Sequence, residues 1–354
     1  MENIFIKNIY VDKVRNLHDF DIEISQTEKK HLILTGKNGS GKTSLLESIV
    51  DNIAQKTSFF SVNIEFIPLE NQDKFLLAYI PAKRSLDMEV PKSIEKVDIK
   101  NKSAINDDLS RDFLKYIIYL DYQRLRAKND EDKQRLQQWF DRFELALKDI
   151  YNCPELHLEP IPDDLIFKIK MPNIEPFGLN EMADGYSAFL DIIIELILRM
   201  DDGNAGVNMD LPGIVLIDEI ETHLHIELQK KVLPFLTAMF PNVQFIVSTH
   251  SPFVINSISN AVVFDLENGR RVEDLSAYSW ETIVESYFEA GQYSHVMIEK
   301  FNKYRELYNK ERSPDEEKEF FRIRMELKKV SPAQKELYNA FRQMELDLSG
   351  KAAK

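Results

Sequence analysis

The chain has 354 residues, 44% of them hydrophobic and 29% charged, and its formal net charge is −14. This length can bury one large core or two modest ones, and no apolar run reaches the roughly 18–20 residues that a membrane-spanning helix needs. The acidic balance argues against a sequence-independent DNA-coating protein, because phosphate would be repelled, although dimerisation could still create a local basic groove.

The N-terminal segment, MENIFIKNIYV, lacks the basic region and the small-residue cleavage site of a signal peptide. Cys153 is the single cysteine of the chain, which excludes an intrachain disulfide and a thiol cluster for zinc. We therefore expect a cytoplasmic protein with no membrane partner.

A glycine-rich loop follows the first short apolar run. Residues 31–35 (HLILT) read as a strand, GKNGSGKTS as a loop, and LLESIVDNI as an amphipathic helix. This strand–loop–helix context is the one that a G-x-x-x-x-G-K-[ST] phosphate-binding loop requires. Chance would produce the pattern in only about one chain of this length in a hundred, so a plain surface turn is the weaker interpretation.

This loop predicts a binding site for ATP and Mg²⁺. Glycines allow the backbone to point its N–H groups at an anion, and the positive end of the following helix adds to the attraction. Lys42 is expected to neutralise the β- and γ-phosphates, and the Thr43 hydroxyl to bind Mg²⁺. The expected nucleotide-binding residues are Gly36, Asn38, Gly39, Ser40, Gly41, Lys42, Thr43 and Ser44.

Residues 86–175 are expected to interrupt the nucleotide-binding domain as a helical insertion with return strands. Residues 96–108 are polar and linker-like, and residues 111–151 read as a helical hairpin broken near KNDEDK. The return strands should turn at residues 162–164. One helical face, for which internal packing is favoured over contact with a partner, carries Leu136, Trp139, Phe140, Phe143 and Leu147.

A second phosphate-binding helix N-terminus is predicted within LNEMADGYSAFLDIIIELI. A turn with Ala183, Asp184 and Gly185 opens a strongly apolar helix from about Tyr186. Its free N–H groups suit a phosphate, and because the chain already has one phosphate site, this one is expected to serve a neighbour's nucleotide in a dimer. An Asp-Gly turn that only starts a core helix is a serious rival interpretation.

Two carboxylates end the next predicted strand. Residues 213–217 (GIVLI) form a continuous apolar run, typical of a strand buried on both faces of a parallel sheet, and ligands bind at the carboxyl ends of such strands. Asp218 is expected to hold Mg²⁺ through water, and Glu219 to polarise the attacking water as general base. The alternative, that both carboxylates only cap the next helix, is weakened by the nearby phosphate loop.

A histidine follows the third strand signal, residues 243–247 (VQFIV). Ser248, Thr249 and His250 come directly after it. From this strand end His250 could hydrogen-bond a γ-phosphate, whereas an isolated histidine would more often be structural. Its order and spacing after Asp218 favour the functional interpretation.

The C-terminal part, residues 271–354, includes the end of a predicted hairpin (residues 261–276) and reads as charged helices beyond it. Its aromatic residues include Tyr287, Phe288, Tyr293, Phe301, Tyr304, Phe320, Phe321, Tyr338 and Phe341. A self-packed helical bundle is the simpler expectation, and a docking surface for dimerisation or for a partner protein is the alternative.

Together, GKNGSGKTSLLESI, MADGYSAFL, IVLIDEIETHLH and IVSTHSPFVI resemble the ABC ATPases of the SMC–RecF–RecN class. The resemblance extends to the compact prokaryotic OLD/Septu (PtuA-like) branch found in antiphage defence systems, and it covers residues 1 to about 270. It implies an ABC-type P-loop α/β fold with a RecA-like parallel sheet, an antiparallel N-terminal lobe, a helical insertion and a C-terminal helical region. It also implies a homodimer with ATP at the interface, each nucleotide held by one P-loop and the partner's signature segment, Ala183–Gly185.

The same resemblance implies roles for further residues and reveals two departures. Arg15 and Asn16 would lie near the adenine. Residues 221–225 (ETHLH) resemble the D-loop, where His223 and His225 are expected on different sides of a helix, which argues against a metal pair. Ala183 stands where the family signature has serine, so hydrolysis should be slow. The Q-loop glutamine has no clear counterpart: Arg84 lies near the right place, and Gln123 is in a predicted helix.

The expected organisation is an N-terminal ATPase lobe with the P-loop (1–85), the insertion (86–175), a C-terminal ATPase lobe (176–270) and a helical tail (271–354). The resemblance implies an ATP-hydrolysing sensor or regulatory subunit of an antiphage defence complex with a separate effector, often a nuclease. The tail itself lacks the clustered carboxylates of a nuclease metal site. A RecF-like DNA-repair or DNA-end-binding ATPase is the alternative, and a stand-alone NTPase with a dimerisation tail is the third.

Overall fold

The computed structural model describes residues 5–55, 61–66, 75–84, 88–97, 109–201, 209–286, 295–328 and 341–344. The chain divides into two compact units, Met1–Trp280 and Glu281–Lys354, which are described separately below. The expected boundary at residues 270/271 falls inside a strand, β12 (Arg270–Glu273), which belongs to the first unit. The polar segment expected as a linker lies largely outside the described residues.

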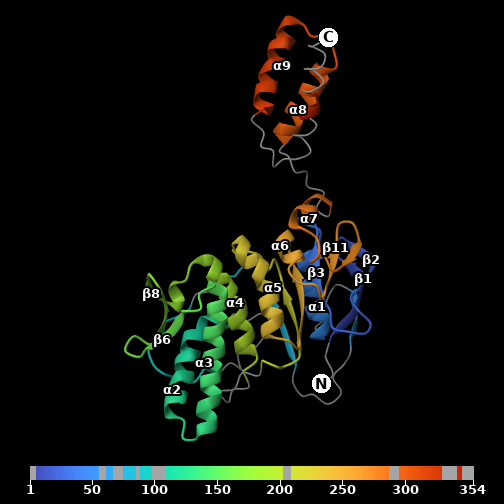
Figure 1. Cartoon of the computed structure of the whole chain (residues 1–354). Helices are drawn as coiled ribbons and strands as arrows, with labels where there is room; N and C mark the ends of the chain where they lie inside the picture. Colours follow the sequence, from blue (N-terminus) through green and yellow to red (C-terminus); the bar gives the residue numbers. More distant parts are fainter. Residues whose placement is uncertain are drawn as a thin grey trace. The chain divides into compact units, whose positions relative to one another are not determined.

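A six-stranded sheet runs through the first unit (Figure 1), in the order β12-β11-β3-β10-β9-β5. All of its strands are parallel except β12, which pairs antiparallel with β11. The bounds are His31–Thr35 (β3), Leu76–Ile80 (β5), Gly213–Ile217 (β9), Val243–Ser248 (β10) and Ala261–Asp265 (β11). Parallel strands end at one edge of a sheet, so the segments that follow β3, β9 and β10 meet there.

The three strands expected from apolar runs are β3, β9 and β10. They are neighbours in the sheet, and all their residues are buried. Helices or a second sheet cover both faces of such strands, and this is why the sequence of each is a continuous apolar run rather than an alternating one. The hairpin expected near the end of the domain is β11–β12.

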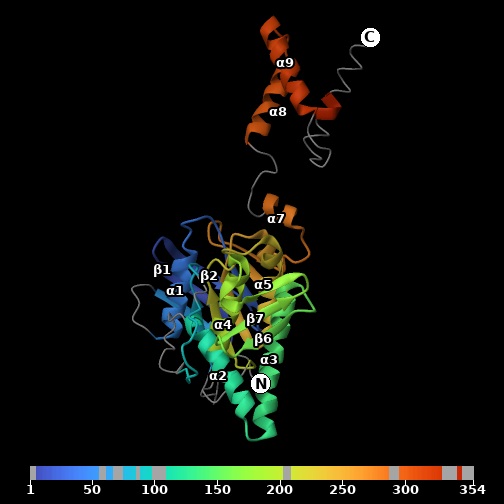
Figure 2. The ribbon, with the colours of Figure 1, turned by 90° about the vertical axis from the view of Figure 1, so that its left-hand side faces the viewer.

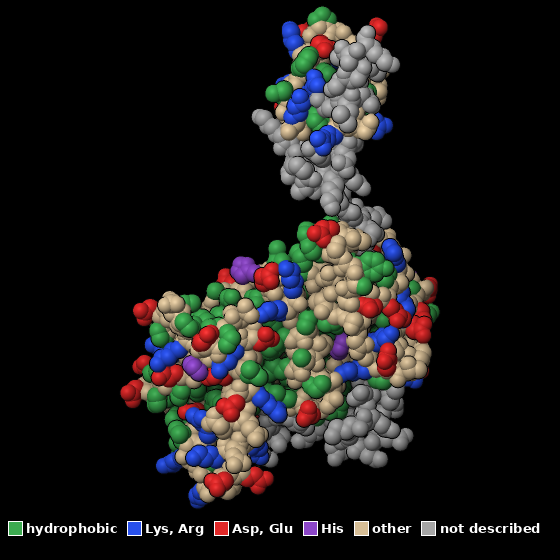
Figure 3. Space-filling view, in the orientation of Figure 1, with side chains coloured by type: hydrophobic (Ala, Val, Ile, Leu, Met, Phe, Trp, Pro, Cys, Tyr) green, Lys and Arg blue, Asp and Glu red, His purple; other side chains and the backbone are tan. Residues whose placement is uncertain are grey.

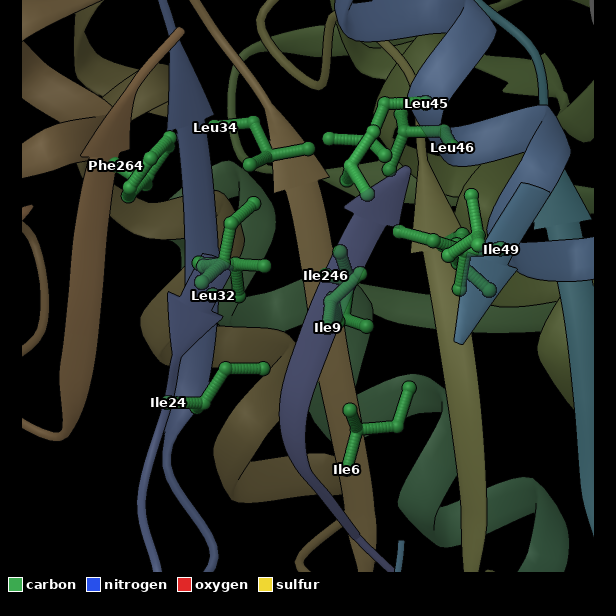
Figure 4. Close-up of a cluster of buried hydrophobic side chains, with 14 of the residues drawn as sticks. Ile6, Ile9, Ile24, Leu32, Leu34, Leu45, Leu46, Ile49, Ile246 and Phe264 are labelled. Atoms are coloured by element: carbon green, nitrogen blue, oxygen red, sulfur yellow. The ribbon is translucent and has the colours of Figure 1, made fainter. Parts of the chain in front are cut away.

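A three-stranded antiparallel sheet packs against the helix that follows the phosphate loop. Its order is β2-β1-β4, with β1 at Ile6–Val14, β2 at Leu17–Glu23 and β4 at Ser61–Phe66. Helix α1 (Lys42–Ile53) contributes Leu45, Leu46 and Ile49 to the core shared with this sheet and the parallel sheet (Figure 4). The antiparallel N-terminal lobe, and with it the expected fold class, is confirmed.

The insertion folds as a helical hairpin followed by a small sheet (Figures 1 and 2). Helices α2 (Phe113–Arg126) and α3 (Asp130–Tyr151) are separated at Asn129, whose side chain accepts a hydrogen bond from Asp132 N. The predicted apolar face is buried inside the hairpin, where the rings of Trp139 and Phe143 stack with centroids 5.4 Å apart. Internal packing of this face is therefore confirmed.

The return strands turn where the proline-aspartate segment predicts. β6 (His157–Ile161) pairs with β7 (Ile166–Met171), and a third strand that the sequence did not predict, β8 (Ile174–Gly178), completes the sheet.

The chain then enters α4 (Asp184–Arg199), while α5 (Ile226–Met239) follows β9 and the short α6 (Pro252–Ile255) follows β10. Among the described residues, no helix has the length and apolar character needed to cross a membrane.

The second unit is built around two helices, α8 (His295–Tyr308) and α9 (Pro314–Leu327), after the short α7 (Trp280–Ser286) that spans the boundary. Its core contains Tyr304, Leu307, Phe320, Ile323, Leu327 and Phe341. The rings of Tyr304 and Phe320 stack with centroids 4.9 Å apart. The aromatic residues of the tail therefore pack at least in part on one another; Tyr287, Phe288, Tyr293 and Tyr338 lie outside the described residues.

Candidate nucleotide-binding site

The loop between β3 and α1 has a backbone that requires glycine. Gly36, Gly39 and Gly41 have φ angles of 133°, 83° and 100°, which L side chains rarely adopt. Space is also limiting, because a Cβ at Gly41 would lie 2.9 Å from Leu17 Cδ1, and a Cβ at Gly36 would lie 2.9 Å from Ser40 Oγ. The sequence therefore specifies this loop through both torsion and close packing.

Lys42 points back into the loop. Its Nζ donates hydrogen bonds to Gly36 O at 2.8 Å and to Lys37 O at 3.1 Å. Burial lowers the pKa of Lys42, and the carboxylates of Glu219, Asp218, Glu221 and Asp265 act in the opposite direction. A buried ammonium that is bonded to two loop carbonyls is placed to contact an anion that binds in the loop.

Thr43 and Asp218 come together from different elements. Thr43 Oγ1 donates to Asp218 Oδ2 at 2.7 Å, and Ser248 Oγ donates to Asp218 Oδ1 at 2.5 Å. Asp218 is only 3% exposed. A hydroxyl and a carboxylate side by side are ligands that suit Mg²⁺. The described residues contain no cluster of three or more His, Cys, Asp or Glu that could hold a metal, so such an ion would need phosphate oxygens and water as well.

Glu219 lies in a tight turn and not at a helix N-terminus. Its φ angle is +43°, its N–H donates to Ser248 Oγ at 2.7 Å, and its carboxylate accepts from Thr222 Oγ1 at 3.2 Å. Helix α5 begins only at Ile226. The alternative that Asp218 and Glu219 serve to cap the next helix is therefore wrong.

The expectation that His223 and His225 lie on a helix is also wrong. His223 is in the turn, with a φ angle of 66°, and His225 is the residue that precedes α5 as its N-cap. The helix begins later than expected because the turn after β9 is hydrogen-bonded to β10: Ile220 N donates to Ser248 O at 3.1 Å. Both histidine side chains are exposed.

Arg84, considered above as a possible counterpart of the Q-loop residue, contacts the backbone of the Asp218 turn. Its guanidinium donates to Asp218 O at 3.1 Å, to Glu219 O at 2.8 Å and to Ile220 O at 3.3 Å. As a cation it cannot ligate Mg²⁺. Gln123 lies in α2, where its amide donates to Tyr119 Oη at 2.7 Å. The sequence analysis thus singled out Arg84 but did not predict its contacts with residues 218–220.

His250 is held by Glu221, a residue that the sequence analysis placed only within the D-loop-like segment. His250 N donates to Glu221 Oε1 at 2.6 Å, and Thr249 Oγ1 donates to Glu221 Oε2 at 2.7 Å. Within the described part of the chain, the Nε2 atom of His250 and the Oγ atom of Ser40 are buried without a hydrogen-bond partner. Buried polar groups normally have partners, so these two atoms suit a site that takes up a polar ligand.

The predicted signature segment forms the first turn of α4. The helix begins at Asp184, two residues before the expected start, and Ala183 is its N-cap residue without a side-chain hydrogen bond. Ala183 and Asp184 are exposed, whereas Gly185 is buried against His223 and His225, where a Cβ would lie 3.1 Å from His223 O. The Tyr186 ring stacks on Tyr151 at 4.1 Å. This segment therefore contacts the D-loop-like turn and the end of α3.

The remaining predicted residues lie around the loop. Arg15 and Asn16 form the exposed β1–β2 turn, which Leu17 brings next to Gly41. Asn38 and Thr43 are exposed, and Ser44 is buried in the first turn of α1. The P-loop, Asp218, Glu219 and His250 are thus gathered at the carboxyl edge of the sheet, as the sequence predicts.

A separate cavity of about 790 Å³ lies between α3 and α5. Its lining includes Arg142, Leu145, Lys230, Lys231 and Phe235. Figure 3 shows hydrophobic side chains mixed with lysines and arginines over the face formed by α3 to α5. None of the P-loop or Asp218 turn residues lines this cavity, so it is distinct from the site described above.

Comparisons with known proteins fit this geometry. A family model described as "AAA domain, putative AbiEii toxin, Type IV TA system" matches residues 92–256, which include Asp218 and His250 but not the P-loop. The "Retron Ec83 probable ATPase" of Escherichia coli is 33% identical over 144 residues, 39% of this chain and 26% of that protein. "Septu protein PtuA" of Bacillus mycoides (strain KBAB4) is 36% identical over 94 residues, 26% of this chain and 13% of that protein.

Two further proteins show a more distant similarity. "DNA replication and repair protein RecF" of Clostridium acetobutylicum is 31% identical over 96 residues, 26% of this chain and 26% of that protein. The crystal structure of an SMC head bound to the C-winged helix domain of ScpA aligns with a TM-score of 0.41 at 13% identity, over 77% of this chain and 99% of that chain, which is too distant to carry an argument. The chain matches 26% or less of the length of these three curated relatives. The resemblance to RecF and to ATPases named for retron and Septu systems is confirmed.

Proposed function

We propose that this chain, which resembles RecF and the ATPases of retron and Septu systems in sequence, binds ATP with Mg²⁺ and hydrolyses it. The observation that carries the proposal is the contact between Thr43 and Asp218 at 2.7 Å, directly beside the buried ammonium of Lys42. Three kinds of group needed for phosphoryl chemistry, a cation, a hydroxyl and a carboxylate, are thereby placed in one loop-lined site.

Each side chain has a defined task in this proposal. Lys42 exchanges its bonds to Gly36 O and Lys37 O for bonds to the β- and γ-phosphates. Thr43 and Asp218 hold Mg²⁺, which neutralises phosphate charge when bound. Glu219 polarises the attacking water, and the Nε2 atom of His250, for which the described residues offer no partner, hydrogen-bonds the γ-phosphate. Arg15 and Asn16 lie toward the base.

We propose a homodimer in which the partner's Ala183–Gly185 segment meets the nucleotide. The support is that α4 begins without a side-chain cap and that Ala183 and Asp184 are exposed. The free N–H groups of this first turn need an acceptor. Because Ala183 offers no hydroxyl to the γ-phosphate, turnover is expected to be slow.

The biological role that we propose is a cytoplasmic sensor or regulatory subunit of a prokaryotic antiphage defence complex. The retron and Septu names among the relatives support this role, and the resemblance to such systems implies a separate effector protein, with a nuclease as the expected kind. The net charge of −14 suits a protein partner better than a nucleic acid.

The test is phosphate release from Mg·ATP by the full chain, with Glu219→Gln and Lys42→Ala as the matched inactive variants. We expect slow release by the wild type and a loss of at least about 10²-fold in Glu219→Gln. Release that persists unchanged in both variants would assign the activity to a contaminant and refute the proposal.

RecF-like DNA binding is the second candidate, favoured by the 31% identity to RecF over 96 residues. It differs from the first candidate in one measurable way. A DNA-dependent enzyme should hydrolyse ATP faster with DNA, and its DNA affinity should fall steeply with added salt. A rate that is the same with and without DNA, at low and at moderate salt, would favour the protein-regulating role.

A further inference from the structure

Arg84 makes contacts that none of the tasks above explains. It follows β5 and is only 6% exposed, although it carries a full charge. Its Nη1 donates to Asp218 O, and its Nη2 donates to Glu219 O and Ile220 O. One guanidinium thus contacts three consecutive carbonyl groups; arginine spreads its donors over a planar fork, whereas those of lysine all sit on one nitrogen.

The turn that these carbonyls belong to is unfavourable on its own. Glu219 has a φ angle of +43°, in the left-handed region that non-glycine residues rarely occupy. Such a backbone persists only where surrounding contacts determine it. The N–H groups of the turn are bonded as well: Glu219 N donates to Ser248 Oγ and Ile220 N donates to Ser248 O. Arg84 therefore holds the turn through its carbonyl groups, and Ser248 holds it through its N–H groups.

Charge keeps Arg84 in this position. Burial lowers its pKa, and the carboxylates of Asp191, Glu221, Asp218 and Glu219 oppose that effect. Arginine stays protonated in proteins, so a positive charge lies permanently at the backbone of residues 218–220. A buried cation with carbonyl partners and carboxylate neighbours has a strongly preferred place and orientation.

We propose that Arg84 is a positioning residue that fixes the left-handed turn at residues 218–220 and thereby aims the Glu219 carboxylate at the water that attacks ATP. This inference rests on the proposed role of Glu219. It makes a specific claim about kinetics: Arg84 should matter for the turnover number and not for the binding of nucleotide, because within the described part of the chain its guanidinium donates to Pro81 O and to the carbonyls of residues 218–220 and not to the P-loop.

The kinetic experiment compares the full wild-type chain with Arg84→Lys and Arg84→Gln. The control is Lys83→Gln, which removes a neighbouring exposed charge. We expect kcat to fall by about 10²-fold in Arg84→Gln, within the range for a misplaced base, and by less in Arg84→Lys. KM and the affinity for ATP should change by less than about threefold. An equal loss of affinity, or a kcat within about threefold of wild type, would overturn the inference.

Hydrogen exchange gives a readout that does not depend on ATP turnover. In nucleotide-free protein, the amides of residues 218–222 should exchange faster in Arg84→Gln than in the wild type or Lys83→Gln, while α1 and β11 stay as protected as before. If the wild type does not hydrolyse ATP, the proposed function fails, yet the exchange result still decides whether Arg84 holds the turn. Unchanged exchange at residues 218–222 would refute that role. If Arg84→Gln does not fold, Arg84→Lys replaces it in both measurements.

Discussion

Thr43 Oγ1 lies 2.7 Å from Asp218 Oδ2, although 175 positions of the chain separate the two residues. Thr43 is in the first turn of α1, and Asp218 follows the last residue of β9. The pairing exists because β3 and β9 flank β10 in a parallel sheet and so deliver their following segments to one edge. The fold thereby assembles a phosphate loop and a carboxylate that neither segment could provide alone.

The dependence of ATP affinity on magnesium should require the Thr43 hydroxyl. In the wild type, removal of Mg²⁺ with a chelator should weaken ATP binding, whereas Thr43→Val should bind ATP weakly and show little response to the chelator, because the metal has lost one ligand. The control is Thr237→Val, which removes a hydroxyl that bonds Pro234 O in α5. A Thr43→Val protein that keeps the full magnesium response would contradict the assignment.

Glu219→Gln should trap the nucleotide-bound dimer. The change removes the charge of the proposed base while keeping its shape, so turnover should fall by about 10²–10⁴-fold and ATP should stay bound. Mass by light scattering should shift from monomer to dimer when Mg·ATP is added, and the double variant Glu219→Gln with Lys42→Ala should stay monomeric. A Glu219→Gln protein that binds ATP and remains a monomer would refute the dimer.

Gly41→Ala should be more damaging than Gly39→Ala. Both glycines have positive φ angles, but a Cβ at Gly39 meets no atom within 4 Å, whereas at Gly41 it would meet Leu17 Cδ1 at 2.9 Å. Torsional strain is therefore common to both, at about 1–3 kcal/mol, and overpacking adds about 1–3 kcal/mol at Gly41 alone. Denaturant unfolding measures both values, and Leu17→Ala should recover part of the Gly41→Ala loss. Equal losses would show that the contact with Leu17 is unimportant.

Stability should fall in mild acid through His31. Burial lowers the pKa of His31 to about 3, and its Nδ1 accepts a hydrogen bond from Phe245 N at 3.0 Å. The folded state therefore favours the neutral ring: the contribution is complete above the unfolded pKa of about 6.5 and is lost as pH falls from there toward about 3.

At pH 5 the loss relative to pH 7.5 should be about 2 kcal/mol from this residue. His31→Asn should be less stable at neutral pH and should lack this part of the decline between pH 7.5 and 5. The comparison needs unfolding curves for both proteins at several pH values. Parallel declines in the two proteins would show that other groups cause the acid sensitivity.

The sequence predicts which segments meet at the candidate site, because its motifs are short and local. GKNGSGKT and the apolar runs before Asp218 and His250 each require only neighbouring residues, and their common edge follows from the rules for parallel sheets. The helical hairpin and its buried face were predicted in the same way, because Leu136, Trp139 and Phe143 share one helical face, for which internal packing was favoured over contact with a partner.

Features that depend on contacts between distant segments were not predicted. The start of α5 is delayed to Ile226 because Ser248 and Arg84 hold residues 218–220 in a turn, and no local propensity indicates this. Glu221 was assigned by likeness to a D-loop, yet its carboxylate holds Thr249 and His250. The pattern of β8 was missed because two of its five residues, at Pro176 and Gly178, are poor strand formers.

Calorimetric titration of the full chain with ATP in the presence of Mg²⁺ is the most direct test of whether the P-loop holds nucleotide. We expect saturable binding by the wild type, and Lys42→Ala should lose about 2–5 kcal/mol of affinity, at least about 30-fold, because it removes a buried charge from the phosphates. Lys37→Ala, which removes an ammonium that is 81% exposed, should bind like the wild type. Folded protein that takes up no ATP, or a Lys42→Ala variant that binds it undiminished, would contradict the central claim.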